Sequence, residues 1–333
     1  MAFEVLHSPA EWAARFGARR AALTVGNFDG IHLGHRRILR SVAEGARATG
    51  AVAAAVTFDP HPMKTLHPTD APRLIGTLAQ RLAGMDEAGL DAALVLRFDT
   101  DLAQFSPEDF VRGILVEQLR LQTIHVGENF RFGHQQTGNV PLLEKLGRRY
   151  GFSAGIVPPV VIRGQVVSST AIRRAVGEGR VGFAARLLGR PFTLSGKICP
   201  GTGQGSCLLV PTLNLPAENV EQELRPANGV YATETEVAGR HYRSATNVGV
   251  RPTFDGRRLT IESHLFDFSQ KLTSGPIKVH FWKRLRDEKK FSGPEALREQ
   301  IAADISRSRR FFTLLDRARS QRVGATHLSR HPG

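Results

Sequence analysis

The chain has 333 residues, more than the roughly 250–300 at which a single hydrophobic core stops growing, so we expect two domains. Its hydrophobic fraction of 41% is ordinary for a globular protein, and no apolar run approaches the ~20 residues that cross a bilayer. The N-terminal residues lack the apolar core of a signal peptide, and Cys199 and Cys207 are too few for a disulfide framework. These features argue against a membrane or secreted protein, and we expect a cytoplasmic one with reduced thiols.

The net charge of +14 indicates a polyanionic ligand of some kind. Residues 306–333 alone contribute +6 of it, from seven arginines and one aspartate. The remaining charge fits small phosphorylated molecules, and it also fits nonspecific nucleic-acid binding. Charge alone does not separate these classes, but the sequence contains no nucleic-acid motif, so we expect no nucleic-acid partner.

The first half of the chain alternates short apolar runs with segments of helical spacing. The runs are 21–25, 51–58, 92–98, 123–127 and 154–160. Strands that alternate with helices predict right-handed crossovers and a mostly parallel, doubly wound α/β sheet. Ligands of such sheets bind outside the carboxyl ends of the strands.

The pattern changes after about residue 190, where β-rich segments follow one another and Ala238-Gly239 is typical of a hairpin turn. A helical stretch begins at about Pro294, and the last residues show no periodicity. We predict a first domain over 1–185 and a small antiparallel β-barrel with a C-terminal helix over 186–315. Residues 316–333 are predicted to be a disordered basic tail.

Residues 26–35, "GNFDGIHLGH", follow the first predicted strand and lead into a helix. A glycine-rich turn at this position lets backbone N–H groups approach a phosphate at a helix N-terminus. His32 and His35 are three residues apart, which predicts that they face the same side, and Gly34 between them leaves space for a ligand. A turn that merely carries two surface histidines is the alternative.

A second candidate anion site is "SSTAIRR" (168–174), which follows the fifth predicted strand and begins another helix. Its hydroxyls belong to Ser168, Ser169 and Thr170, and Arg173 follows one turn later. An N-cap serine followed by a solvated arginine is the common alternative. Two such sites at the strand ends of one sheet are much rarer by chance than either alone.

These motifs resemble a known family. The first carries the HxGH signature of nucleotidylyltransferases, "SSTAIR" is similar to their triphosphate-binding motif, and "TFDPHP" and "GENFRFG" are typical of the FMN adenylyltransferase module. In the β-rich half the resemblance rests on "VPTLNL", "NGVY", "NVGVRPTF", "ESHLFDF" and "LRDEKKF". Over roughly residues 15–312 the chain resembles the bacterial bifunctional riboflavin kinase/FAD synthetase family.

The resemblance implies a Rossmann-like nucleotidylyltransferase domain followed by a riboflavin kinase barrel. It also implies two ATP-dependent steps with Mg²⁺: riboflavin to FMN, then FMN to FAD with release of pyrophosphate. Riboflavin, FMN and ATP would then be the partners, and the sequence does not determine the oligomeric state.

For adenylyl transfer, the resemblance implies that His32 and His35 act on the ATP phosphates and the charge that develops during transfer. Ser169, Thr170 and Arg173 would hold the β- and γ-phosphates. The other expected ATP-binding residues are Gly26, Asn27, Phe28, Asp29, Gly30 and Ser168. The expected flavin-binding residues are Phe58, Asp59, Pro60 and Asn129, although plain core packing is an equal alternative for Phe58.

For the kinase, the resemblance implies that Glu262 is the base and that Thr212 and Asn214 hold Mg²⁺ and ATP phosphates. Without the resemblance, Glu262 would be interpreted as a solvent-facing strand residue. Gly201, Gly203 and Gly205 would form a backbone phosphate cradle, and Arg286 is expected to contact the flavin.

The chain departs from the family pattern in 196–215, where a histidine near Pro200, an arginine near Gln204 and a glycine near Leu209 are missing. Two alternatives to the bifunctional enzyme therefore remain. One is an adenylyltransferase joined to a weak or inactive kinase module. The other is a basic flavin- or nucleic-acid-binding regulator with vestigial sites.

Overall fold

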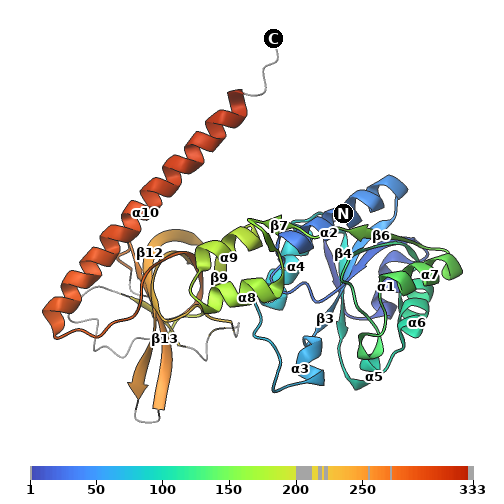
Figure 1. Cartoon of the computed structure of the whole chain (residues 1–333), viewed down its shortest axis with the longest axis horizontal. Helices are drawn as coiled ribbons and strands as arrows, with labels where there is room; N and C mark the ends of the chain where they lie inside the picture. The colour runs from blue at the N-terminus through green and yellow to red at the C-terminus, as the bar shows by residue number, and fades with distance from the viewer. Residues whose placement is uncertain are drawn as a thin grey trace. The chain divides into compact units, whose positions relative to one another are not determined.

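The computed structural model describes the backbone of residues 2–199, 212–216, 220, 224–253, 256–270 and 272–328, and the side chains of all of these except 251–253, 256–259 and 322–328. The chain divides into two compact units (Figure 1). The first contains Met1–Ile172 and Leu187–Gly189, and the second contains Arg173–Arg186 and Arg190–Gly333. This division falls near the ends of helices α8 (Ser169–Gly177) and α9 (Val181–Leu188), and the boundary at 185 stays a prediction.

The first unit is built on a six-stranded, wholly parallel sheet of order β1-β4-β3-β2-β5-β6. Its strands are β1 (Glu4–Leu6), β2 (Ala21–Val25), β3 (Val52–Asp59), β4 (Ala92–Arg97), β5 (Leu121–Gly127) and β6 (Ser153–Val157). The five predicted strands are present, and only the three-residue β1 was not predicted. The strand order reverses at β2, which lies between β3 and β5, so the switch point of the sheet is at the end of β2.

Helices cover both faces of this sheet, as the doubly wound prediction requires (Figure 1). They are α1 (Pro9–Phe16), α2 (Leu33–Thr49), α3 (Pro62–Leu66), α4 (Leu78–Asp86), α5 (Thr100–Ala103), α6 (Pro107–Asp109), the π-helix η1 (Phe110–Gln118), the 3₁₀-helix η2 (His134–Gln136) and α7 (Val140–Tyr150). Alternate residues of β2 enter different cores: Leu23 belongs to one cluster, and Ala22 to the cluster that α2 covers. Every residue of β2 is therefore buried, which holds its carboxyl end in a fixed position.

A short hairpin, β7 (Val161–Ile162) and β8 (Gln165–Val166), separates β6 from α8. The "SSTAIRR" segment thus follows this hairpin rather than the fifth predicted strand directly. The intervening turn at Arg163 and Gly164 has left-handed backbone angles at both residues, with φ of 50° and 76°.

The second unit is a six-stranded antiparallel sheet of order β10-β13-β12-β11-β14-β9. Its strands are β9 (Phe192–Lys197), β10 (Leu213–Pro216), β11 (Gly229–Val237), β12 (Arg240–Thr253), β13 (Gly256–Leu265) and β14 (Pro276–Arg286). Just past β9, the Cys199 N–H donates to the carbonyl of Asn214 at 3.0 Å, an isolated bridge between the two edges of the sheet. The second unit is thus an antiparallel half-barrel, in agreement with the predicted small β-barrel. The predicted turn at Ala238-Gly239 is confirmed, with φ of 50° and 72° as a two-residue hairpin requires.

The prediction of a disordered tail over 316–333 is wrong for residues 316–328, because helix α10 (Pro294–Leu328) continues through them (Figure 1). Residues 329–333 lie outside the described residues. The missing periodicity agrees with the exposure of residues 317–321, which present no buried face. Arg317, Ala318 and Arg319 are nevertheless strong helix formers. Asp316 pairs with Arg243 of β12, and the Arg319 guanidinium lies 4.8 Å from the ring centre of Trp282.

Candidate active sites

The predicted motifs of the first unit lie at neighbouring strand ends. The loop 26–35 follows β2, Phe58 and Asp59 end β3, and Asn129 follows β5. Because these strands are adjacent and parallel, their carboxyl ends share one edge of the sheet at its switch point. This is the position at which open α/β sheets bind ligands.

The loop after β2 has an unusual backbone. Phe28, Gly30 and Ile31 have φ values of 49°, 85° and 40°, a left-handed region that β-branched residues rarely adopt. Phe28 and Ile31 are both buried, so packing holds this strained conformation. Gly30 has a second constraint, because an added Cβ would lie 2.8 Å from the Ile75 side chain.

Asp29 fixes this loop from inside the protein. Its carboxylate accepts the N–H of Ile75 at 3.0 and 3.1 Å and the N–H of Gly76 at 3.2 Å, and the residue is buried. The two oxygens are thus committed to backbone amides, which supports a loop-shaping role for Asp29.

His32 and His35 lie face to face at the start of α2. Their ring centres are 3.6 Å apart with planes inclined by 15°, as expected for residues on the same side. His32 is the N-cap of α2, and its Nδ1 accepts the His35 N–H at 3.2 Å. The neutral His32 ring therefore carries its proton on Nε2. A Cβ at Gly34 would lie 3.1 Å from the His32 ring, so the glycine makes room for that ring.

His35 is held in its neutral form. Burial lowers its pKa well below the usual value, and the neighbouring His32 lowers it further. Its Nδ1 is buried and has no hydrogen-bond partner among the described residues. The edge of Phe28 covers the ring, with centroids 5.3 Å apart. A neutral, partly buried imidazole can donate an N–H to an anion without carrying a positive charge itself.

The first turn of α8 lies against this loop. Ser169 Oγ donates to the carbonyl of Asp29 at 3.1 Å, and the Val167 carbonyl is 3.7 Å from the Cβ position of Gly34. Ser168 accepts the Ala171 N–H at 3.2 Å and so acts as the helix cap that the alternative interpretation expects. Thr170 is exposed, and Arg173 follows Ser169 by one turn of the same helix. Two helix N-termini thus meet at the end of β2.

Arg81 of α4 was not predicted, yet it connects the ends of β2 and β3. It is 3% exposed, and one terminal nitrogen donates to the carbonyls of Asn27 at 3.0 Å and Phe58 at 3.1 Å and to Thr57 Oγ1 at 3.3 Å. The other terminal nitrogen lies 3.5 Å from Asp59 Oδ1. Burial lowers the pKa of Arg81, against the raising effect of Asp59 and Asp29. In sequence, an arginine between helical apolar positions is typical of a solvated face.

The predicted flavin residues lie on both sides of the histidine loop. Phe58 packs edge-on against Phe98 with ring centres 5.6 Å apart and is only partly buried against the core. The Asp59 side chain is 52% exposed, and Pro60 follows it. Asn129 is exposed beyond β5. This edge therefore offers one half-covered aromatic face and two polar side chains.

In the second unit, the candidate kinase residues form one row across three strands. Asn214 of β10 pairs with Glu262 of β13, which pairs with Asn247 of β12. These residues are partly buried and alternate with the buried Ile261 and Ser263 on the opposite face. Asn247 was not predicted, because only the strand register reveals it.

Thr212 lies beside this row, with its carbonyl 3.5 Å from Asn214 Nδ2 and its side chain exposed. Gly201, Gly203 and Gly205, the predicted phosphate cradle, lie outside the described residues.

Arg286, the remaining predicted flavin contact, binds Asp304 of α10. Its Nε lies 3.1 and 3.0 Å from the two carboxylate oxygens, and a terminal nitrogen lies 2.8 Å from one of them. The other terminal nitrogen donates to the Asp287 carbonyl at 2.9 Å. These contacts attach α10 to the end of β14, and a flavin contact by Arg286 stays a prediction.

The first unit thus has a candidate anion site at the switch point of its parallel sheet, and the second unit has a glutamate between two asparagines on an antiparallel sheet. This combination is suited to a two-domain nucleotide-dependent transferase. Comparison with known proteins identifies the class more closely. Residues 16–171 match the FAD synthetase family and residues 188–312 match the riboflavin kinase family.

Proteins that are similar to this chain over nearly its whole length are named for both activities. The bifunctional riboflavin kinase/FMN adenylyltransferase of Escherichia coli K12 is 35% identical over 293 residues, which is 88% of this chain and 93% of that protein. The protein of the same name from Haemophilus influenzae is 32% identical over 87% of this chain and 94% of its own length. The chain belongs to the bifunctional riboflavin kinase/FMN adenylyltransferase family, which confirms the resemblance found in the sequence.

A solved structure with the same architecture carries a different name. The crystal structure of a macrolide-efflux protein from Streptococcus pneumoniae superposes with a TM-score of 0.80 at 28% identity, over 93% of this chain and 99% of that one. In the part of the present chain that the structure describes, no helix combines the length and apolarity needed to span a membrane.

Proposed function

We propose that the chain phosphorylates riboflavin to FMN with residues of the second unit and adenylylates FMN to FAD with residues of the first. Both steps consume ATP, and the second releases pyrophosphate. One observation carries the proposal: the stacked His32–His35 pair lies against the first turn of α8, where Ser169 is bonded to the loop. Paired helix N-termini with neutral donors suit a polyphosphate.

The adenylyl transfer needs no general base. The nucleophile is a phosphate oxygen of FMN, which is largely anionic at neutral pH because the second pKa of a phosphate monoester is about 6. Catalysis therefore rests on screening the charges and holding the attacking oxygen in line with the α-phosphorus. His32 Nε2–H and His35 donate to the phosphate oxygens that gain charge in the transition state.

The remaining contacts with ATP come from the two helix starts. Ser169 and Thr170 hold the β- and γ-phosphates that leave as pyrophosphate, and Ser168 caps their helix. The same role for Arg173, the first residue of the second unit, stays a prediction. Gly26, Asn27, Phe28 and Gly30 supply the backbone of the loop, which Asp29 fixes through Ile75 and Gly76.

FMN lies at the same edge, between the ends of β3 and β5. Phe58 offers a ring face for the flavin, and Asp59, Pro60 and Asn129 border it. Arg81 holds Asn27, Thr57 and Phe58 together and so positions the flavin side of the site relative to the phosphate side.

The kinase step differs because its nucleophile is a neutral hydroxyl of the ribityl chain. A positioned base is needed, and Glu262 takes the proton. Asn214, in register with Glu262, offers an amide oxygen, and Thr212, two residues earlier, offers a hydroxyl. With the Glu262 carboxylate these oxygen donors suit Mg²⁺. When bound there, Mg²⁺ neutralises charge on the ATP phosphates.

The partners in this proposal are riboflavin, FMN and ATP, with Mg²⁺ as cofactor and Arg286 near the flavin of the kinase site. We assign the enzyme to the cytoplasm because both steps draw on ATP.

Incubation of the purified chain with riboflavin, ATP and Mg²⁺ tests the proposal when the flavins are separated by chromatography. FMN should form first and FAD should follow, and supplied FMN should give FAD without riboflavin kinase activity. A folded protein that leaves both riboflavin and FMN unchanged would contradict the proposal. A chain that uses only FMN would retain the adenylyltransferase assignment and reject the kinase one.

A further inference from the structure

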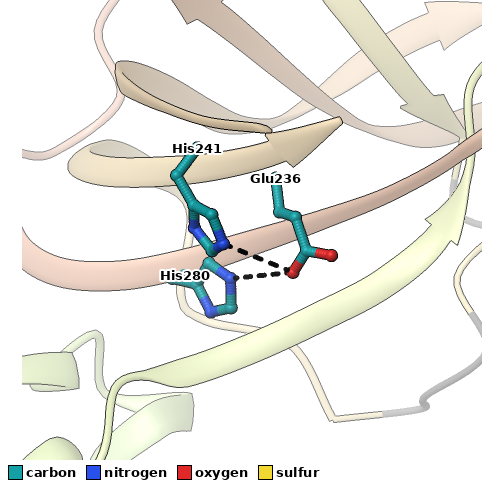
Figure 2. A group of neighbouring side chains, drawn as sticks. All are labelled: Glu236, His241 and His280. Carbon is teal, nitrogen blue, oxygen red and sulfur yellow. Dashed lines mark ion pairs between the residues drawn. The ribbon is translucent and has the colours of Figure 1, made fainter. Parts of the chain in front are cut away.

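Two histidines and a glutamate form a cluster on the sheet of the second unit, and neither proposed active site uses it (Figure 2). Glu236 of β11 pairs in register with His241 of β12 and Lys278 of β14. His280 lies two residues beyond Lys278 on the same face of β14. The strand register therefore brings three metal-binding residue types together from three strands.

The two rings point the same nitrogen at the same oxygen. Glu236 Oε2 lies 4.0 Å from His241 Nε2 and 3.9 Å from His280 Nε2, as the dashed lines in Figure 2 show. The rings are nearly parallel, with centroids 5.8 Å apart and planes inclined by 19°. One potential ligand atom from each of the three residues lies within 4.8 Å of the others.

Neighbouring residues fix the orientation of both rings. His280 Nδ1 lies 2.8 Å from Thr193 Oγ1, and that hydroxyl lies 3.2 Å from the Pro191 carbonyl. Because the hydroxyl has one proton to give to the carbonyl, it accepts from the ring, so Nδ1 of His280 carries the proton. His241 Nδ1 lies 3.1 Å from Glu234 Oε1, which can only accept as a carboxylate.

Because Nδ1 of each ring is occupied in this way, Nε2 is the ring nitrogen that both histidines direct at Glu236. The His280 Nε2 is buried and has no hydrogen-bond partner among the residues that the structure describes. Two imidazole nitrogens and a carboxylate oxygen therefore converge, and a metal cation is a ligand that all three atoms could bind together.

We propose that Glu236, His241 and His280 bind a divalent transition-metal ion of the Zn²⁺ type. Two imidazole nitrogens and one carboxylate oxygen suit zinc, and the fourth position stays open to water or a small ligand. Bonds of about 2.0–2.2 Å in a tetrahedral site put ligand atoms about 3.4 Å apart. Small rotations of the half-exposed His241 side chain and of Glu236 close the present spacing.

Thr193 and Glu234 take the positions of outer partners in this site. Metal-binding histidines commonly donate their second ring N–H to a carboxylate or another oxygen, which orients the ring. Lys278 opposes metal binding, because its Nζ lies 3.1 and 3.2 Å from the two Glu236 oxygens. Its ammonium group therefore competes with a metal ion for the Glu236 carboxylate. Its side chain is 50% exposed and can move away.

Metal titration of the full chain, first stripped with a chelator, tests the proposal. Zn²⁺ affinity is measured by competition with a chromophoric chelator, and Co²⁺ binding is followed by visible absorption. We expect one equivalent to bind the wild type and at least a tenfold weaker affinity for that equivalent in His241→Ala, His280→Ala and Glu236→Gln. His7→Ala, at an exposed position of the first unit, is the matched control and should bind like the wild type.

Two further variants sharpen the outcome. Thr193→Val removes an outer partner and should weaken binding about 10–100-fold while all three ligands remain. Lys278→Met removes the competitor and should tighten binding. His241 is 55% exposed, so His241→Ala tests the site even if His280→Ala does not fold. Equal affinity in the wild type and a folded His241→Ala would overturn the proposal.

Discussion

The two proposed active sites use the same co-substrate, but their carboxylates are placed very differently. In the first unit, Asp29 is bound by backbone N–H groups and Asp59 lies beside the buried Arg81. In the second unit, Glu262 is partly buried and pairs in register with an asparagine on each neighbouring strand.

This difference follows from the nucleophiles. A phosphate oxygen arrives already ionised and needs donors, whereas a hydroxyl must lose a proton and needs a base. The predictions below test whether the two sites are separate and whether each contains the chemistry that its nucleophile requires.

Replacement of the proposed base should have the largest effect. Glu262→Gln keeps the shape of the side chain but cannot accept a proton, and a positioned base contributes about 10²–10⁴-fold. Riboflavin phosphorylation should fall by that factor while supplied FMN still becomes FAD at the wild-type rate. Steady-state rates on the two substrates, with circular dichroism as a folding control, measure the contrast. A folded variant that phosphorylates riboflavin normally would remove Glu262 from the mechanism.

The opposite contrast is expected for His35→Ala. Loss of one preorganised donor to developing charge costs about 10²–10³ in rate. FAD formation should drop accordingly, and riboflavin should still be converted to FMN. If the folded variant loses both activities to a similar degree, the assignment of two independent sites fails.

Arg81→Met should act mainly on stability. The substitution leaves the Asn27 and Phe58 carbonyls and the Thr57 hydroxyl without their donor, and hydrogen bonds to charged groups contribute about 1.5–3 kcal/mol each. Because partial relaxation is expected, we predict that the first unit unfolds with about 3 kcal/mol less free energy. Urea denaturation curves followed by circular dichroism measure this loss of unfolding free energy, and calorimetry measures it independently.

Arg40→Met on the exposed face of α2 is the matched control for this effect. FAD formation should also decline in Arg81→Met, because the flavin side of the site loses its link to the phosphate side. Equal stability of the two variants would show that the Arg81 contacts contribute nothing net.

Sequence patterns predicted the parts of this protein that depend on neighbouring residues in the chain. Alternation of apolar runs with helical spacing identified the strands of the parallel sheet, and glycine and histidine spacing located the loop after β2. The Ala238-Gly239 turn was predictable because left-handed angles favour few residue types.

The features that sequence did not predict depend on tertiary contacts. Arg81 is a buried anchor only because the ends of β2 and β3 lie beside α4. Asn247 lies beside Glu262 only because of the strand register. Arg286 pairs with Asp304, which lies on α10, a separate element later in the chain. Strand β1 is too short to show a period, and its parallel pairing with β4 fixes it instead.

The protonation of His35 gives a smaller, pH-dependent effect. Its pKa is lowered in the folded state, so below about pH 6.5 the unfolded chain binds more protons than the folded one. The free energy of unfolding is therefore unaffected by His35 protonation above that pH. It decreases as the pH falls toward the folded-state pKa, because the unfolded chain takes up the proton more readily. Between pH 7.5 and 5.5, the wild type should lose about 1 kcal/mol more than His35→Ala.

Denaturation curves of both proteins at each pH measure this difference, with His7→Ala as the control for an exposed histidine. The rate of FAD formation should show no titration of His35 between pH 6.5 and 8, because the ring stays neutral throughout that range. Parallel pH dependence in the wild type and His35→Ala would contradict the neutral-donor assignment.

The smallest effect is expected at the C-terminus, where the helix that replaces the predicted tail contacts the barrel through its first exposed turns. A chain that ends at residue 320 keeps the Asp316–Arg243 pair and the Arg319–Trp282 contact, and its stability should equal that of the full chain. A chain that ends at residue 315 loses both. Exposed ion pairs contribute about 0.2–1 kcal/mol and exposed cation–π contacts about 0.5–1 kcal/mol, so the second unit should lose about 1 kcal/mol.

The double variant Asp316→Ala/Arg319→Ala is the matched control and should reproduce the loss without shortening the chain. Both activities should persist in all three proteins, since neither proposed site includes residues beyond Arg286. If the chain ending at 315 is as stable as the full chain, these two contacts do not stabilise the barrel.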